Sequence, residues 1–256
     1  MTYRDILYST DDGVATIAIN RPQRLNAITG HSIAEIEDAL SVAGRDRDVG
    51  VIVLTGVGNR AFSVGGDLAW EAEGGLENTR YDLGRKLVEH AKPIIARVDG
   101  YAIGAGNHMA YFCDFTIASD VSTFGQNGTR VAAIPAGYTA THLAAIIGHK
   151  RAREMEFFCR KHTAQQALEW GLINAVVPRE QLDATVRAWC DELLMMSPTA
   201  MAALKASFRV AMEPYFNLTL NEVIAKVKPD FFRSGEQQEG AASFFEKRRP
   251  DYSRWR

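Results

Sequence analysis

The chain has few cysteines and no excess of charge of either sign. Cys113, Cys159 and Cys190 lie far apart and form no CxxC pair. A disulfide framework and a cysteine zinc site are therefore not expected, and a reducing compartment is the default. Lys and Arg number 29 against 31 Asp and Glu, which gives a formal net charge of -2. The sequence thus has no global basic field to hold a nucleic acid or an anionic membrane, and we expect neither as a partner.

Long apolar runs are also missing. No stretch approaches the roughly 18 apolar residues of a membrane-spanning helix, and the polar start MTYRDILYSTDDG lacks the apolar run of a signal peptide. We therefore expect a cytoplasmic protein. The six histidines are scattered, and no pair has the spacing of a helical zinc motif, so no metal site is predicted. The 256 residues are 46% hydrophobic, as in an ordinary globular protein.

Strand and helix signals alternate along the first part of the chain. A turn at residues 10–13 separates two strand-length apolar runs, which predicts a hairpin. Residues 31–43 carry apolar side chains at helical spacing. The runs VGVIVLTG, KPIIARVDGYAIG and CDFTIAS are almost uniformly apolar, as in parallel strands covered on both faces. This order predicts a wound α/β architecture, followed by helices over residues 181–196 and 198–212.

Two glycine-rich turns are candidate parts of a site. One spans residues 62–68 and the other residues 104–108, and each follows an apolar strand. Small residues there let a ligand approach the backbone and leave N–H groups free to donate. If the two turns converge, they form an oxyanion hole for a carbonyl oxygen; if they do not, each is a tight connection. Neither turn has the GxGxxG or GxxxxGK spacing of a nucleotide loop.

A set of motifs distributed in order along nearly the whole chain resembles the crotonase (enoyl-CoA hydratase/isomerase) superfamily. The motifs are Asn20-Arg21-Pro22 with Asn26-Ala27, Ala61-Phe62-x-x-Gly65-Gly66-Asp67, Lys92-Pro93, the run from Gly100 to Gly106, Cys113-Asp114, Phe124-Gly125-Gln126, Gly171-Leu172 and Val177-Pro178.

The resemblance implies an α/β fold, a crotonase-like spiral of ββα units over residues 1–196. A C-terminal helical trimerisation region over 197–256 would assemble a homotrimer or hexamer. It also implies an acyl-CoA thioester as substrate, with coenzyme A as part of the substrate and no separate cofactor. By the same resemblance, the backbone N–H groups of Gly66 and Ala105 form the oxyanion hole that stabilises a thioester enolate.

Further binding residues follow from the resemblance. Arg24, Leu25 and Ala27 match the strand end that contacts the adenine and phosphates, and Lys247, with Arg248, matches a tail that reaches an adjoining subunit's nucleotide. A solvated basic tail is an equally good interpretation of Lys247 and its neighbours. The acyl group is expected next to the first glycine turn, at Asp67 and Leu68, and beside Gly128 and Arg130, where an anion or substrate carboxylate could fit.

The acid and base residues depart from the hydratase pattern. Hydratases of this superfamily use two glutamates, and the matching positions here are His108 and Gly128. Since glycine cannot move a proton, ordinary hydration is not expected. The FGQNG segment, GY at 137–138 and the tail EKRRPDY most resemble the 1,4-dihydroxy-2-naphthoyl-CoA synthases and the 2-ketocyclohexanecarboxyl-CoA hydrolases. Both branches carry an aspartate where this chain has Pro135, so their acid/base group is missing, relocated or replaced by bicarbonate.

His108 and Tyr138 are the leading candidates for that function. His108 exchanges a proton near neutral pH and occupies a hydratase glutamate position. Tyr138 could donate a hydrogen bond to an enolate oxygen. His142, one helical turn after Tyr138, is more readily a trimer contact. Glu71 follows the first glycine turn near the acyl pocket, but solvent exposure is the better expectation for a lone loop glutamate.

Three functions are compatible with the sequence. The first is an acyl-CoA enzyme that makes or breaks a carbon–carbon bond through an enolate. The second is an enoyl-CoA hydratase or isomerase with atypical acid/base residues. The third is a non-catalytic acyl-CoA-binding or RNA-binding paralogue, and the near-neutral charge disfavours RNA.

Overall fold

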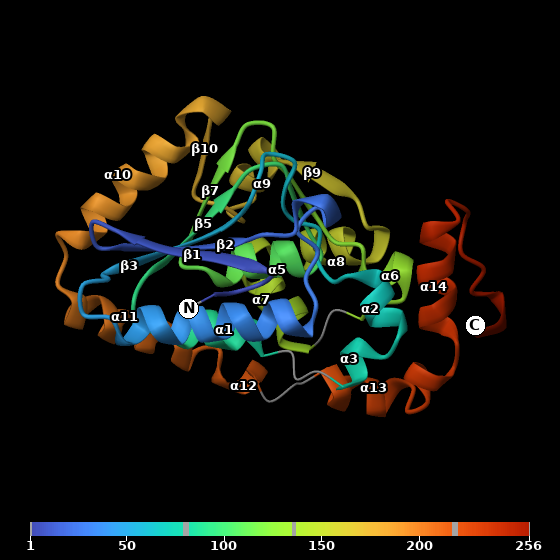
Figure 1. Ribbon diagram of the computed structural model, residues 1–256. Helices are drawn as coiled ribbons and strands as arrows, with labels where there is room; N and C mark the ends of the chain where they lie inside the picture. The colour runs from blue at the N-terminus through green and yellow to red at the C-terminus, as the bar shows by residue number, and fades with distance from the viewer. Residues whose placement is uncertain (1, 79–81, 135–136, 217–219, 256) are drawn as a thin grey trace.

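The computed structural model describes residues 2–78, 82–134, 137–216 and 220–255 and contains two sheets (Figure 1). The larger sheet has the order β1-β2-β3-β5-β7-β10 and the smaller one β4-β6-β8-β9. The first comprises β1 (Ile6–Asp11), β2 (Val14–Ile19), β3 (Val51–Gly56), β5 (Ile94–Val98), β7 (Phe115–Ser119) and β10 (Ala175–Val177). The second comprises β4 (Ala61–Ser63), β6 (Tyr101–Ile103), β8 (Thr123–Gly125) and β9 (Lys161–Thr163).

Three successive units each place one strand in each sheet and then add a helix. They are β3-β4-α2, β5-β6-α5 and β7-β8-α6, and the strands that correspond to one another pair in parallel. The predicted spiral of ββα units is confirmed. The helices of these units are α2 (Leu68–Ala72), α5 (Ala105–Phe112) and α6 (Gly128–Val131). Two further helices, α3 (Gly75–Asn78) and α4 (Leu83–Glu89), lie between α2 and β5.

Local sequence explains the first elements. Strands β1 and β2 form the predicted antiparallel hairpin around a turn in which Asp12 and Gly13 have positive φ angles of 42° and 81°. Helix α1 (Gly30–Arg45) begins at a capping box of Thr29 and Ser32. Its apolar face is buried under the hairpin strands, where Ile36 is fully covered.

The apolar run KPIIARVDGYAIG forms two strands and not the single strand that its composition predicts. The chain turns at Asp99-Gly100, where Gly100 has a φ of +77°, so β5 joins the larger sheet and β6 the smaller. This turn carries the second glycine-rich segment toward the first.

The larger sheet is covered on both faces, as its uniformly apolar strands predict. Along β3, Ile52 and Leu54 face the main core, while Val51 and Val53 face a second core under α10 (Leu182–Leu194). Alternation along one strand thus fixes which helices lie on which face.

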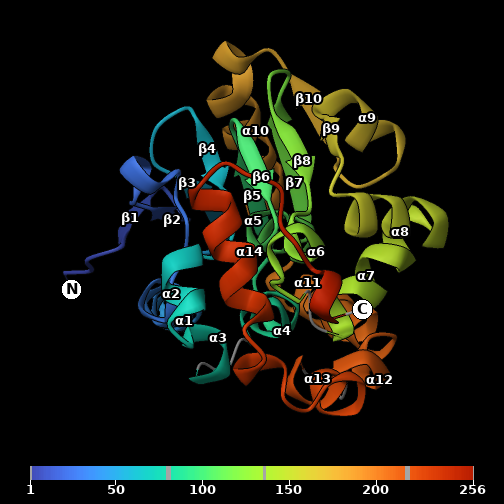
Figure 2. The same ribbon diagram turned by 90° about the vertical axis from the view of Figure 1, so that its right-hand side faces the viewer.

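Over its described residues, the chain after β10 forms helices joined by turns and short irregular segments, with no further strand. It contains α10, α11 (Pro198–Val210), α12 (Glu213–Phe216), α13 (Leu220–Val227) and α14 (Glu236–Phe245). Between β8 and β10 lie α7 (Gly137–Ile147), α8 (His149–Phe158) and α9 (Ala164–Glu169). Helix α14 returns to the spiral and packs between α2 and α6 (Figure 2). Over the described ranges, no helix has the length and apolarity needed to cross a bilayer.

Asn26 fixes the chain between β2 and α1 against the first ββα unit. Its side-chain amide donates to the carbonyl oxygens of Val57 (3.1 Å) and Ala61 (2.7 Å), and its amide oxygen accepts from the N–H of Arg21 (3.0 Å). The residue is 1% exposed and has a positive φ of 55°. One buried side chain therefore satisfies three backbone groups in a conformation that asparagine tolerates well.

We expect Asn26→Ala to lower the free energy of unfolding by about 3 kcal/mol, because it leaves buried backbone groups without partners and places alanine in the left-handed region. Chemical denaturation measures this difference. The matched control Asn59→Ala changes an exposed side chain, and its effect should be within about 0.5 kcal/mol. Equal effects of the two changes would contradict the assignment.

Candidate functional site

The two glycine-rich turns meet. A Cβ atom built on Gly65 would lie 3.0 Å from the backbone nitrogen of Ala105 and 2.9 Å from the carbonyl oxygen of Ile103. Gly65 also has a φ of +93°, so both conformation and space require glycine there. The convergence on which an oxyanion hole depends is therefore present.

The N–H groups of Gly66 and Ala105 are available at this junction. The N–H of Gly65 donates to Ser63 Oγ (3.2 Å), and that of Asp67 donates to the Ile28 carbonyl (2.8 Å). Within the described ranges, the amides of Gly66 and Ala105 donate to no other residue, and both residues line one pocket. Ala105 is the first residue of α5, where helix N–H groups lack intrahelical acceptors.

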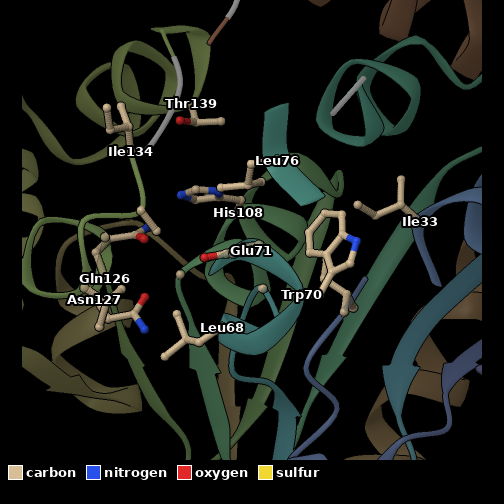
Figure 3. A pocket seen from close by; sticks show the side chains of 17 residues that line it. Ile33, Leu68, Trp70, Glu71, Leu76, His108, Gln126, Asn127, Ile134 and Thr139 are labelled. Atoms are coloured by element: carbon tan, nitrogen blue, oxygen red, sulfur yellow. The ribbon is translucent and has the colours of Figure 1, made fainter. Parts of the chain in front are cut away.

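The inner pocket at this junction is mostly apolar (Figure 3). Its polar side chains are those of Glu71, His108, Gln126, Asn127 and Thr139. The other lining residues are Ile28, Ile33, Gly66, Leu68, Trp70, Leu76, Gly104, Ala105, Gly128, Val131, Ala133 and Ile134. Electrostatic interactions in such surroundings are stronger than in water.

Glu71 is buried, which corrects the expectation that it is exposed to solvent. It lies on α2, is 7% exposed, and lines the inner pocket. A Cβ atom on Gly66 would overlap its carboxylate oxygen Oε1, so the carboxyl group lies directly against that glycine. Burial, with a smaller contribution from Asp67, raises the pKa of the Glu71 carboxyl from 4.5 to about 7.

His108 projects from α5 into the same pocket and is 7% exposed. Burial lowers the pKa of its imidazole to about 4, while the nearby Gln126 amide acts in the opposite direction. Neither ring nitrogen makes a hydrogen bond of normal geometry to a described residue. The imidazole is therefore neutral at pH 7 and free to donate from one nitrogen and accept at the other.

An outer cleft of about 460 Å³ adjoins the inner pocket through Gly66 and Leu68. Its lining includes the predicted binding residues Arg24, Leu25, Ala27, Asp67, Leu68 and Arg130, together with Phe244 and Phe245 of α14. Asp67 caps α2 and pairs with Arg21 at 3.0 Å, so its carboxylate anchors the turn. Of the residues predicted to bind substrate, Gly128 lines the inner pocket.

Tyr138, His142 and Lys247 lie outside both cavities. Tyr138 is packed in the core, with its ring centroid 5.5 Å from that of Phe112 and 5.4 Å from that of Phe216, and α7 presents Thr139 to the pocket instead. His142 stacks on Phe112 at 4.8 Å within the chain.

Lys247 is exposed just after α14. The guanidinium of its neighbour Arg248 pairs with Glu239 at 2.6 Å. Pro135, the position of the missing aspartate, lies outside the described residues.

Sequence reasoning did not select Glu71 or Gln126 as site residues. A signal for Glu71 was present, because the Asp67 cap places residue 71 one helical turn on, on the same face as Leu68. Among the described residues, no three His, Cys, Asp or Glu side chains gather as a metal-binding group.

Comparisons with known proteins show the family and the fold. The sequence model of the enoyl-CoA hydratase/isomerase family matches residues 9–254. A methylmalonyl-CoA decarboxylase in complex with 2-nitronate-propionyl-CoA superposes with a TM-score of 0.87 at 28% identity, covering 98% of this chain and 99% of that chain. An enoyl-CoA hydratase from Mycobacterium avium subsp. paratuberculosis K-10 gives a TM-score of 0.85 at 29% identity, covering 98% and 100% of the two chains.

The raised pKa of Glu71 predicts a pH-dependent stability. Because the folded state binds this proton more tightly than the unfolded state, its contribution is fully present below pH 4.5 and is lost as pH rises to about 7. The free energy of unfolding of Glu71→Gln, minus that of the native chain, should therefore increase by about 3 kcal/mol from pH 4.5 to pH 8. Denaturant titrations at the two pH values measure this gain. Glu73→Gln, an exposed neighbour, should show none.

Proposed function

Because this chain belongs to the enoyl-CoA hydratase/isomerase family, the crotonase superfamily, we propose that it makes or breaks a carbon–carbon bond of an acyl-CoA thioester. The reaction passes through an enolate whose oxygen accepts hydrogen bonds from the Gly66 and Ala105 amides. The observation that carries the proposal is the meeting of these two free N–H groups at an apolar pocket. Fixed donors at the carbonyl oxygen stabilise the charge that develops there.

The proton-transfer groups favour this chemistry over hydration. At the two positions that match the hydratase glutamates, the pocket is lined by His108, neutral at pH 7, and by Gly128. Addition of water across a double bond requires one group to deprotonate water and another to protonate the α-carbon. A decarboxylation that leaves the thioester as its enolate needs a single proton at the α-carbon. A hydrolytic carbon–carbon cleavage also takes one proton from water, and the same group can return that proton to the α-carbon.

Two substrate classes meet this requirement. In a β-keto thioester, a base takes a proton from water as the water oxygen adds to the ketone carbon. The bond to the α-carbon then breaks, its electron pair forms the thioester enolate, and the α-carbon takes up the proton. In a thioester with a carboxylate on its α-carbon, the bond between these two carbons breaks with loss of carbon dioxide. The first class corresponds to the 2-ketocyclohexanecarboxyl-CoA hydrolase resemblance, and its reverse to the dihydroxynaphthoyl-CoA synthase resemblance. The superposition on methylmalonyl-CoA decarboxylase supports the second.

The outer cleft fits the coenzyme A part of such a substrate. Arg24 and Arg130 both line it and supply cationic groups for phosphate, although the chain has no net positive charge. Coenzyme A enters as part of the substrate, and the proposal includes no separate cofactor.

Homo-oligomers, trimers or hexamers, are part of the proposal. Apolar side chains are exposed on α11, including Leu204 (58%), Phe208 (73%) and Val210 (66%). An exposed apolar surface of this kind is typical of a protein contact.

An enoyl-CoA hydratase or isomerase is the second candidate. It is favoured by the buried Glu71 carboxyl, which could carry a proton between two carbons, and by the superposition on an enoyl-CoA hydratase.

The purified protein should cleave 2-ketocyclohexanecarboxyl-CoA or methylmalonyl-CoA, and it should not hydrate crotonyl-CoA. Mass spectrometry of the products from the three separate incubations tests this. Hydration of crotonyl-CoA alone would overturn carbon–carbon chemistry in favour of the second candidate. Inertness toward all three would contradict the proposal for these substrate classes.

Replacing Ala105 with proline removes one donor of the oxyanion hole at a helix position that accepts proline. On the substrate that is turned over, we expect kcat/KM to fall by about 100- to 1000-fold, because the proline Cδ replaces the amide hydrogen and faces the carbonyl oxygen. Steady-state kinetics measure kcat/KM, and circular dichroism checks the fold. An unchanged kcat/KM would mean that the Ala105 amide does not bind the enolate oxygen.

A further inference from the structure

We propose that the carboxyl group of Glu71 is the catalytic acid/base that exchanges a proton with the α-carbon of the bound thioester. This assignment rests on the enolate chemistry of the proposed function. It supplies the acid/base group that the family resemblance does not identify in this chain. The carboxyl comes from α2, the helix that directly follows the first oxyanion residue.

The position of Glu71 next to the oxyanion hole is the first argument. Its Oε1 occupies the space where a side chain on Gly66 would begin, and its Oε2 is buried with no hydrogen-bond partner in the described structure. Figure 3 shows the carboxyl group and the His108 ring pointing in the same direction into the cavity. A thioester carbonyl bound to the Gly66 amide therefore brings its α-carbon close to this carboxyl.

The chemistry of the other lining residues is the second argument. Among the described residues of the inner pocket, Glu71 and His108 are the two titratable ones. His108 is neutral at pH 7, because burial lowers its pKa to about 4, so little of it is present as an acid. Its unpartnered nitrogens suit it to orient a neighbouring group or the substrate by hydrogen bonding.

Charge determines the direction of transfer. An enolate beside an ionised carboxylate would be repelled by it, so the enolate complex favours Glu71 in its neutral form. In the cleavage direction, the enolate electron pair takes the Glu71 proton to form the new C–H bond, and Glu71 becomes a carboxylate that regains a proton from solvent. In the reverse direction, the carboxylate removes the α-proton and becomes neutral as the enolate forms.

The elements around Glu71 provide little other charge. Asp67 precedes it on the same segment, and α5 contributes His108. Helix α14 packs on α2 through Gln238, whose amide donates to the Ala72 carbonyl at 3.3 Å, and its Glu239 is paired with Arg248. Glu71 thus supplies within the chain a carboxyl group that bound bicarbonate would otherwise have to provide.

Exchange of the α-protons of butyryl-CoA in heavy water tests the assignment, because it requires proton transfer and no carbon–carbon cleavage. Mass spectrometry measures deuterium uptake by the intact thioester. We expect the native protein to catalyse exchange and Glu71→Gln to lose it by about 100-fold or more. Calorimetric titration with butyryl-CoA should give similar affinities for both, since glutamine keeps the size of the side chain.

The control is Glu73→Gln, an exposed carboxyl two residues further on, which should exchange at the native rate. Exchange by Glu71→Gln at the native rate, or no exchange by the native protein, overturns the assignment. The product analysis distinguishes this failure from failure of the proposed function. If the protein catalyses exchange through Glu71 but cleaves no carbon–carbon bond, the assignment of Glu71 stands and the proposed reaction is wrong. If it cleaves the bond and Glu71→Gln exchanges at the native rate, the reaction stands and the assignment is wrong.

Discussion

The close approach of two backbone turns is the constraint on which the site depends. Gly65 lies so near Ala105 and Ile103 that no side chain fits between the turns. Two units of the spiral, β3-β4-α2 and β5-β6-α5, must therefore pack with their strand-to-helix connections in contact. Rigid parallel strands on both sides hold the two amides in place, so little reorganisation is needed when charge develops on a carbonyl oxygen.

The same arrangement explains how a carboxyl group reaches the pocket. Because Gly66 has no side chain, the space beside its Cα is occupied by the Glu71 carboxyl, one turn into α2. Asp67 caps that helix and pairs with Arg21, which fixes where the first turn of α2 points. Glycine at position 66 thus serves two purposes: it exposes a donor to the ligand and gives an acid room to lie next to it.

Much of the fold could be predicted because its signals are local. The hairpin, the α1 periodicity and the doubly buried strand β3 each depend on residues adjacent in sequence. The division of KPIIARVDGYAIG into β5 and β6 was not predicted, because the Asp99-Gly100 turn lies inside an apolar run. The burial of Glu71 could not be predicted from neighbouring residues, because it depends on α5, α14 and the Gly66 backbone. A lone glutamate near a loop is ordinarily solvated.

For Tyr138, the direction of the side chain likewise could not be predicted from the sequence. Its place on a helix was predictable. A helix presents adjacent residues about 100° apart, and here Thr139 faces the pocket while Tyr138 packs on Phe112 and Phe216. Which of two neighbours lines a cavity is decided by the packing of α4, α5 and α12 against α7.

The site contains one acid of raised pKa and one neutral imidazole, and this asymmetry limits its chemistry. Two ionised carboxylates in so apolar a pocket would each raise the pKa of the other, and one would take up a proton. A single carboxyl with a pKa of about 7 exists in both forms near neutral pH, so it can give a proton to a carbon and recover it from solvent at little cost. The enolate needs one proton at one carbon, and the geometry around Gly66 holds one such group at that place.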